Sequence, residues 1–204
     1  MGTVEDHETH CDWSLQGEID QFCETVPNKE KDHFWNLVNQ IEKEIDDLAK
    51  IIQPSTRQID LLEVFCSDCS AITDQVQKLG GTSIRFGRTQ GDLETAEGRR
   101  ALFVQLLKHR PKNVWMSPTC GPWSGFSTLN GSRSIEAWDE LQAIRLRHLE
   151  QIALCIVVHR FQRQRQHHFH WEQPRGSLMF KLPYLQEALF YLLAVDVDLC
   201  TAGD

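Results

Sequence analysis

The sequence predicts an α/β protein, a three-layer sandwich around a mainly parallel sheet that is incomplete at the C-terminus. Short apolar runs typical of buried strands alternate with longer helical patterns from residue 59 onward. Turn signals rich in Gly and Pro separate these segments. Strands that alternate with helices form parallel sheets with right-handed crossovers, because each helix returns the chain to the edge where its strand began.

The N-terminal region carries the acidity of the chain. The formal net charge is −8; residues 1–57 carry 13 acidic and 5 basic side chains, and the remaining residues carry 16 of each. We expect residues 1–28 to form an acidic flexible tail, because they are polar and lack periodicity. This distribution argues against a uniformly basic nucleic-acid binder but leaves room for a local basic surface.

Residues 29–54 are predicted to form one amphipathic helix. Asp32 is the expected N-cap, and Pro54 follows the end. Apolar residues recur at steps of three and four, namely Phe34, Leu37, Val38, Ile41, Ile45, Leu48 and Ile52. We interpret this stripe, helix 34–52, as a surface that packs on the following domain; contact with a protein partner is the alternative.

Residues 55–204 are predicted to form the α/β domain itself. Strands are expected at residues 59–66, 82–86, 113–116, 168–172 and 195–200. Helices are expected from Asp68 or Ser70 to Gly80, from Thr95 to His109, from Ser134 to Arg165 and from Pro183 to Leu193. The sequence ends where a further connection is expected, which indicates the incomplete sheet.

Composition narrows the class of protein further. Seven cysteines are scattered without a framework, so a disulfide scaffold is not expected. The N-terminus does not resemble a signal peptide, and apolar runs such as residues 152–158 are too short for a transmembrane segment. We therefore expect an intracellular protein, nuclear or cytoplasmic, with no membrane partner.

Two polar segments that follow predicted strands carry the candidate chemistry. Cys120 lies in SPTCGPWS (117–124), where Pro118 and Pro122 restrict the backbone on both sides of the thiol. Glu172 begins the second segment, EQPRGS (172–177). Because both segments leave carboxyl ends of strands, we expect Cys120 and Glu172 to face one cavity, within roughly 10 Å.

Four motifs resemble, in order, those of the cytosine-C5 methyltransferases, a branch of the class I S-adenosylmethionine-dependent methyltransferases. The segment EVFCSDCS (63–70) resembles the family's glycine-rich turn after the first strand, and GDL (91–93) its Gly-Asp-Ile turn. The Cys120 segment is similar to the Pro-Pro-Cys-Gln-x-x-Ser loop, and EQP to the Glu-Asn-Val or Glu-Asn-Pro motif. The two last segments are also similar to reading frames associated with mobile elements.

This resemblance implies a Rossmann-like methyltransferase sandwich with S-adenosylmethionine as cofactor and nucleic acid as substrate. Cys120 would attack carbon 6 of cytosine, and Glu172 would protonate ring nitrogen 3. No metal is expected. Cofactor contacts are expected at Glu63, Phe65, Ser67, Asp92 and Pro118, with Asp92 at the adenine. Phosphate contacts are expected at Ser124, Ser127, Arg133 and Arg175.

The chain departs from the family pattern at the cofactor site. Ser67 and Cys69 stand where the family has glycines, and we expect their side chains to narrow the pocket. Residues 85–88 (RFGR) stand where the family's ribose-binding acid is found. The later arginine motif and target-recognition region are not found. We therefore expect little or no methyl transfer by this chain alone.

Other interpretations remain open. Cys120 can be a buried structural thiol, and Glu172 a brace for its loop. Cys66 and Cys69 form a Cys-x-x-Cys pair that suits redox chemistry or half of a zinc site. The alternative function is a non-catalytic nucleic-acid-binding or protein-interaction module of the same fold, and a third is a small thiol enzyme that pairs Cys120 with His170.

Overall fold

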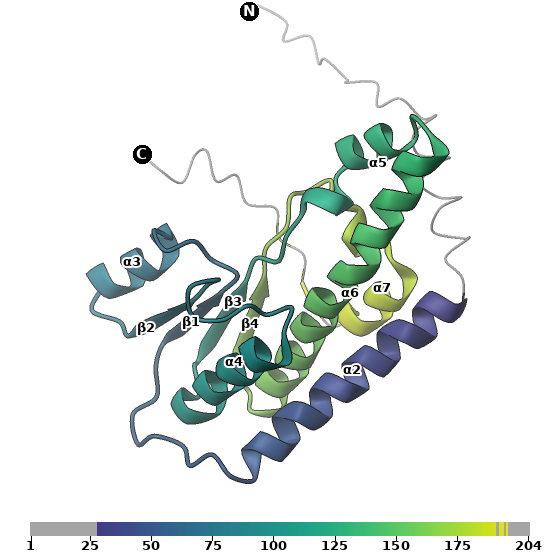
Figure 1. Ribbon diagram of the computed structural model, residues 1–204. Helices are drawn as coiled ribbons and strands as arrows, with labels where there is room; N and C mark the ends of the chain where they lie inside the picture. The colour runs from purple at the N-terminus through teal and green to yellow at the C-terminus, as the bar shows by residue number, and fades with distance from the viewer. Residues whose placement is uncertain (1–27, 191, 194, 196–204) are drawn as a thin grey trace, which may run out of the picture.

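The computed structural model describes residues 28–190, 192, 193 and 195, which form a Rossmann-like α/β fold (Figure 1). Its strands are β1 (Leu61–Val64), β2 (Ser83–Phe86), β3 (Asn113–Met116) and β4 (His168–Trp171). They pair in parallel in the order β2-β1-β3-β4. The predicted class is confirmed. The fifth predicted strand lies outside the described residues except for Val195.

Helices occupy the connections. They are α2 (Asn28–Ala49), α3 (Ala71–Lys78), α4 (Ala96–His109), α5 (Gly125–Gly131), α6 (Ile135–Gln164) and α7 (Pro183–Leu189), with 3-10 turns η1 (Gly121–Trp123) and η2 (Leu178–Lys181). The helix starts predicted at Thr95 and Ser134 are confirmed, because each residue is the N-cap of its helix and its side chain accepts a backbone N–H bond from the third residue after it. Asp32 as an N-cap is wrong, since α2 already runs from Asn28 through polar, helix-favouring residues.

Right-handed crossovers place helices on both faces of the sheet. β1 leads to β2 on one side, and β2 leads back past β1 to β3, so α3 and α4 lie on opposite faces. Glu63 faces α3, where it accepts a bond from Thr73, whereas Leu62 and Val64 point into the main core. Figure 1 shows α3 apart from the layer of α4 and α6.

Helix α2 covers the outside of α4 and α6. The residues of its stripe that are fully buried are Phe34, Val38, Ile41, Ile45 and Leu48. They belong to the same hydrophobic core as α4, α6 and the sheet. These residues of the stripe are thus a packing surface of this fold, as the first interpretation predicted.

Ion pairs fix α2 in this position. The buried Arg99 of α4 donates from Nε and Nη2 to the two carboxylate oxygens of Glu44, at 3.2 and 3.3 Å. Its Nη1 donates to Glu150 of α6 at 3.3 Å. Arg160 of α6 donates to Glu42 at 2.7 Å and lies over the ring of Trp35. Two arginines therefore join three helices.

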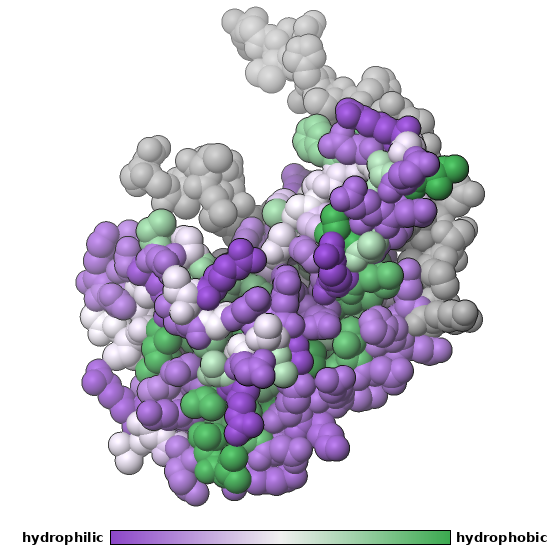
Figure 2. All heavy atoms as spheres, viewed as in Figure 1, coloured by the Kyte–Doolittle hydropathy of each residue, from purple (hydrophilic) through white to green (hydrophobic). Residues whose placement is uncertain are grey.

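The longest helix, α6, is buried mainly in its C-terminal half. Residues 151–159 are all buried, and they lie against β4 and α2. Within the described part of the chain, no helix combines the length and apolar character needed to cross a bilayer. The outer surface in Figure 2 is mostly hydrophilic, with apolar patches such as the one near the end of α2, where Ile51 is exposed.

Replacing Ile41 by Ala should lower the free energy of unfolding by about 2 to 5 kcal/mol, because the side chain is buried between α2 and the core. Asn39→Ala, on the exposed side of the same helix, is the matched control and should change it by less than about 0.5 kcal/mol. Chemical denaturation monitored by circular dichroism measures both. Equal effects of the two substitutions would show that α2 does not pack as described.

Candidate functional site

All four strands end at the same level of the sheet. Val64 pairs with Phe86 and with Met116, and Met116 pairs with Trp171. These four residues are the last of their strands. The loops that follow therefore leave one edge, and their first residues are Phe65, Gly87, Ser117 and Glu172. The two predicted segments with Cys120 and Glu172 share this edge.

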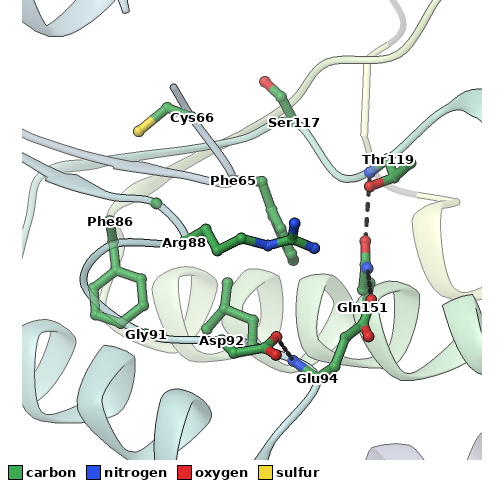
Figure 3. A pocket seen from close by; sticks show the side chains of 12 residues that line it. Phe65, Cys66, Phe86, Arg88, Gly91, Asp92, Glu94, Ser117, Thr119 and Gln151 are labelled. Carbon is green, nitrogen blue, oxygen red and sulfur yellow. Dashed lines mark hydrogen bonds between the residues drawn. The ribbon is translucent and has the colours of Figure 1, made fainter. Parts of the chain in front are cut away.

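A pocket of about 330 Å³ opens at this edge (Figure 3). It lies where β1 and β3 are neighbours, the point at which successive connections turn in opposite directions, and such points are common ligand sites in α/β sheets. Its lining comes from the end of β2, the turns after β1, β2 and β3, the segment before α4 and one residue of α6. The lining residues are Phe65, Cys66, Phe86, Gly87, Arg88, Gly91, Asp92, Leu93, Glu94, Ser117, Thr119 and Gln151.

The turn after β1 supplies Phe65 to the pocket. Phe65 has a φ of 62°, a left-handed conformation that is unusual for an aromatic residue, while its N–H still donates to Phe86 at 3.1 Å. Ser67 and Cys69 are exposed and lie outside the pocket lining. The expected narrowing by these two side chains is therefore not seen.

Asp92 lies on the rim of the pocket and is held there by the start of α4. Its Oδ1 accepts the N–H of Glu94 at 3.1 Å, as Figure 3 shows. A Cβ added to Gly98 would lie 1.9 Å from the carbonyl oxygen of Asp92, so glycine is required for this close approach. Asp92 thus lines the pocket from a turn whose geometry is fixed by the backbone.

Gln151 of α6 connects two walls of the pocket. Its Nε2 donates to Glu94 at 3.0 Å, and its Oε1 accepts the N–H of Thr119 at 3.4 Å (Figure 3). The Gln151 side chain is buried, whereas Glu94 and Thr119 lie at the surface of the pocket. The segment that leads to Cys120 is thereby fixed relative to the start of α4.

The half-buried Cys120 precedes η1, and Arg145 of α6 holds the following loop. The buried Arg145 donates from Nε to the Pro122 carbonyl at 3.0 Å and from Nη2 to Thr128 at 2.8 Å. Its guanidinium lies 5.4 Å from the ring centre of Trp123 and 5.8 Å from that of Trp138. Burial lowers the pKa of Arg145 to about 10, so the side chain stays charged at neutral pH.

The predicted phosphate ligands lie in different surroundings. The Ser124 hydroxyl accepts the N–H of Ser127 at 3.1 Å, and the Ser127 hydroxyl donates to the Gly121 carbonyl at 2.5 Å. Both serines therefore close the Cys120 loop. Arg133, between α5 and α6, and Arg175, after β4, are exposed. None of the four lines the pocket.

Glu172 follows β4 on the loop next to that of Cys120. Its N–H continues the sheet by donating to Met116 at 3.0 Å. The next residue, Gln173, donates from Nε2 to the Pro118 carbonyl at 2.5 Å and so joins the two loops. Cys120 and Glu172 are thus brought to adjacent loops, beside the pocket and outside its lining.

Two further predicted cofactor residues have structural contacts. The buried carboxylate of Glu63 accepts bonds from the Ser70 and Thr73 hydroxyls and from the Thr73 N–H at 3.2 Å. It therefore accepts a backbone N–H bond from the first turn of α3, where such groups lack a partner within the helix. Pro118 is buried and offers its carbonyl to Gln173. Neither residue lines the pocket, whereas Phe65 and Asp92 do.

The alternative metal and thiol sites find little support. No group of three or more metal-binding side chains occurs in the described ranges, although Cys66 and Cys69 are close in sequence. His170 stacks on Trp115 with ring centres 5.5 Å apart and bonds Asn113 at 3.2 Å. These contacts hold His170 against the sheet face.

Sequence reasoning missed three residues of this region: Arg88, Arg145 and Gln151. Arg88 follows β2 and lines the pocket, while the other two come from α6. The only available signal was a polar residue within the apolar pattern of the long helix, at Gln151. Comparisons of the chain with protein-family models, curated proteins and solved structures gave no match. The fold and the site geometry therefore carry the functional argument.

The thiol of Cys66 should have a higher pKa than an ordinary cysteine. Its pKa is raised by burial and, secondarily, by the negative charge of Glu63. A raised pKa keeps the thiol protonated to higher pH, so the midpoint of its alkylation rate against pH should lie above that of the unfolded chain. Peptide mapping after timed iodoacetamide treatment measures this. A midpoint equal to or below the unfolded value would contradict the described surroundings.

Proposed function

We propose that this chain is a cytosine-C5 methyltransferase-like domain that binds S-adenosylmethionine at the strand-end pocket and a nucleic-acid base beside it. One observation carries the proposal: the turns after β1, β2 and β3 enclose a pocket that shares Ser117 and Thr119 with the segment leading to Cys120. A small-molecule site and a candidate nucleophile are thereby adjacent.

The residues of the pocket fit such a cofactor. Phe65, Phe86 and Leu93 provide apolar surface for a nucleoside ring, and the Asp92 carboxylate can accept from an amino group or ribose hydroxyl. The volume of about 330 Å³ lies within the usual range for small-molecule sites. Arg88 adds a positive charge that suits an anionic group. S-adenosylmethionine supplies an electrophilic methyl group on a sulfonium.

The loops beside the pocket provide groups for attack on a pyrimidine. The Cys120 thiolate would bond to carbon 6 of the base, while Glu172 protonates ring nitrogen 3, which makes carbon 5 nucleophilic. After methyl transfer to carbon 5, with S-adenosylhomocysteine as the other product, loss of the carbon 5 proton to solvent would break the sulfur–carbon bond, restore the Cys120 thiolate and return the nitrogen 3 proton to Glu172. Arg145 and Gln173 would hold the two loops at a fixed separation.

The base would have to leave a duplex stack to reach these loops, unless the substrate is single-stranded. Cys120 is only half-buried, so it is accessible to a base from outside. Arg133 and Arg175, both exposed near the two loops in sequence, are the candidate contacts to phosphate.

Asp92→Asn should weaken binding of S-adenosylmethionine by roughly tenfold to a hundredfold, because it removes a charge-assisted hydrogen bond worth about 1.5 to 3 kcal/mol. Asparagine keeps the oxygen that accepts the Glu94 N–H, so the turn is preserved. Isothermal titration calorimetry measures the affinity, and Glu97→Gln, on the exposed first turn of α4, is the control. Unchanged affinity in Asp92→Asn would remove Asp92 from the site.

A methyl-transfer assay tests the proposed roles of Cys120 and Glu172. Incubation with radiolabelled cofactor and mixed DNA and RNA should give little or no transfer by this chain alone. Any transfer that is detected should be lost in Cys120→Ala and reduced about 10² to 10⁴-fold in Glu172→Gln. Cys69→Ala, an exposed thiol on another loop, should leave it unchanged. Transfer that survives in Cys120→Ala would exclude the covalent route. Nucleic-acid binding without any transfer would instead identify the non-catalytic module.

A further inference from the structure

Arg88 extends into the strand-end pocket and is not neutralised by any residue that the structure describes. The residue follows β2 directly after Gly87, and Figure 3 shows its side chain reaching over the pocket. Within the described part of the chain, its guanidinium forms no hydrogen bond or ion pair. A free guanidinium in a concave site offers paired donors that match a carboxylate or phosphate.

The carboxylates in the same pocket are held by other groups. Asp92 accepts the Glu94 N–H at 3.1 Å, and Glu94 accepts from Gln151 at 3.0 Å. Arg85, three residues before Arg88, behaves differently: it donates to the Ser70 carbonyl at 2.6 Å and pairs with Asp74. The fold thus uses Arg85 for its own packing and leaves Arg88 to the pocket.

The backbone at Arg88 is fixed against β1. The Gly87 N–H donates to the Gln90 side chain at 2.7 Å, and the Gly87 carbonyl accepts the Gln90 N–H at 3.1 Å. A Cβ at Gly87 would lie 2.5 Å from the Cys66 carbonyl oxygen, so the two strand ends touch at this point. The arginine therefore starts from a defined position on the pocket wall.

We propose that Arg88 forms an anion subsite in this pocket, which takes a carboxylate or phosphate carried by an adenosine-type ligand. In dinucleotide-binding α/β sheets, where the second strand also pairs with the first, an acid after the second strand bonds ribose hydroxyls, whereas an arginine nearby accommodates a ribose phosphate. This chain has the arginine. The inference depends on the pocket of the proposed function and not on methyl transfer.

Two pairs of ligands distinguish whether Arg88 binds a carboxylate or a phosphate. S-adenosylmethionine and its decarboxylated form differ only in the carboxylate, and adenosine 2′-phosphate and adenosine differ only in the phosphate. Affinities are measured by calorimetry for the full chain, for Arg88→Gln and for Arg100→Gln, an exposed arginine of α4 outside this pocket. Melting curves confirm that the variants are folded.

In the wild type and in Arg100→Gln, the ligand that lacks the anionic group should bind roughly tenfold to a hundredfold more weakly than its anionic partner, in one of the two pairs. In Arg88→Gln the same ratio should fall to about one. The pair whose affinity ratio falls in Arg88→Gln shows whether the subsite binds a carboxylate or a phosphate. A response only to the phosphate, with no binding of S-adenosylmethionine, would support the subsite and reject the proposed cofactor.

Ratios that stay the same in Arg88→Gln would overturn the subsite while leaving the proposed cofactor intact, provided that S-adenosylmethionine binds. Absence of binding by all four ligands would overturn both. Since Arg88 is exposed and forms no hydrogen bond or ion pair with the residues that the structure describes, its substitution should not alter folding.

Discussion

The in-register parallel pairing of four short strands is the constraint on which the site depends. Val64 is paired on both sides, with Phe86 and Met116, and Met116 is paired again with Trp171. Each strand is four residues long, so all of them end together. A shift of one residue in any pair would turn its side chains to the other face and move one loop away from the edge.

Helix α6 converts this shared edge into a defined site. Gln151 reaches the segment before Cys120 and the start of α4, while Arg145 reaches the carbonyl of Pro122. A buried arginine is costly to desolvate, and here hydrogen bonds and two indole faces offset that cost. The helix is itself held by α2 through the buried apolar stripe and through Arg160 with Glu42. Parts far from the pocket therefore determine how its loops are placed.

Local patterns allowed much of the fold to be predicted from the sequence. The strand at 113–116 and the caps Thr95 and Ser134 carry their information in adjacent residues. Helix α5 could not be predicted, because Gly125–Gly131 has no apolar period and depends on Ser124 and Arg145. The start of α2 was misplaced because polar residues extend the helix beyond its buried stripe.

The candidate site was predictable only in part. Motif spacing indicated that the Cys120 and Glu172 segments leave one edge, and that Phe65 and Asp92 border a pocket. Contacts between residues far apart in sequence left no local signal, so the roles of Gln151 and Arg145 emerged only from the structure. Glu63 shows the opposite case: it matches a cofactor motif, but its carboxylate accepts hydrogen bonds from Thr73 of α3.

Hydrogen exchange in the presence and absence of S-adenosylmethionine tests the central claim most directly. If the strand-end pocket binds the cofactor, amide exchange should slow together in residues 65–70, 87–94 and 117–121, which are distant in sequence and meet only at this edge. The hollow between α2 and α4, lined by residues such as Leu48 and Arg100, should be unaffected. Protection at that hollow, or no protection at a saturating concentration, would contradict the account.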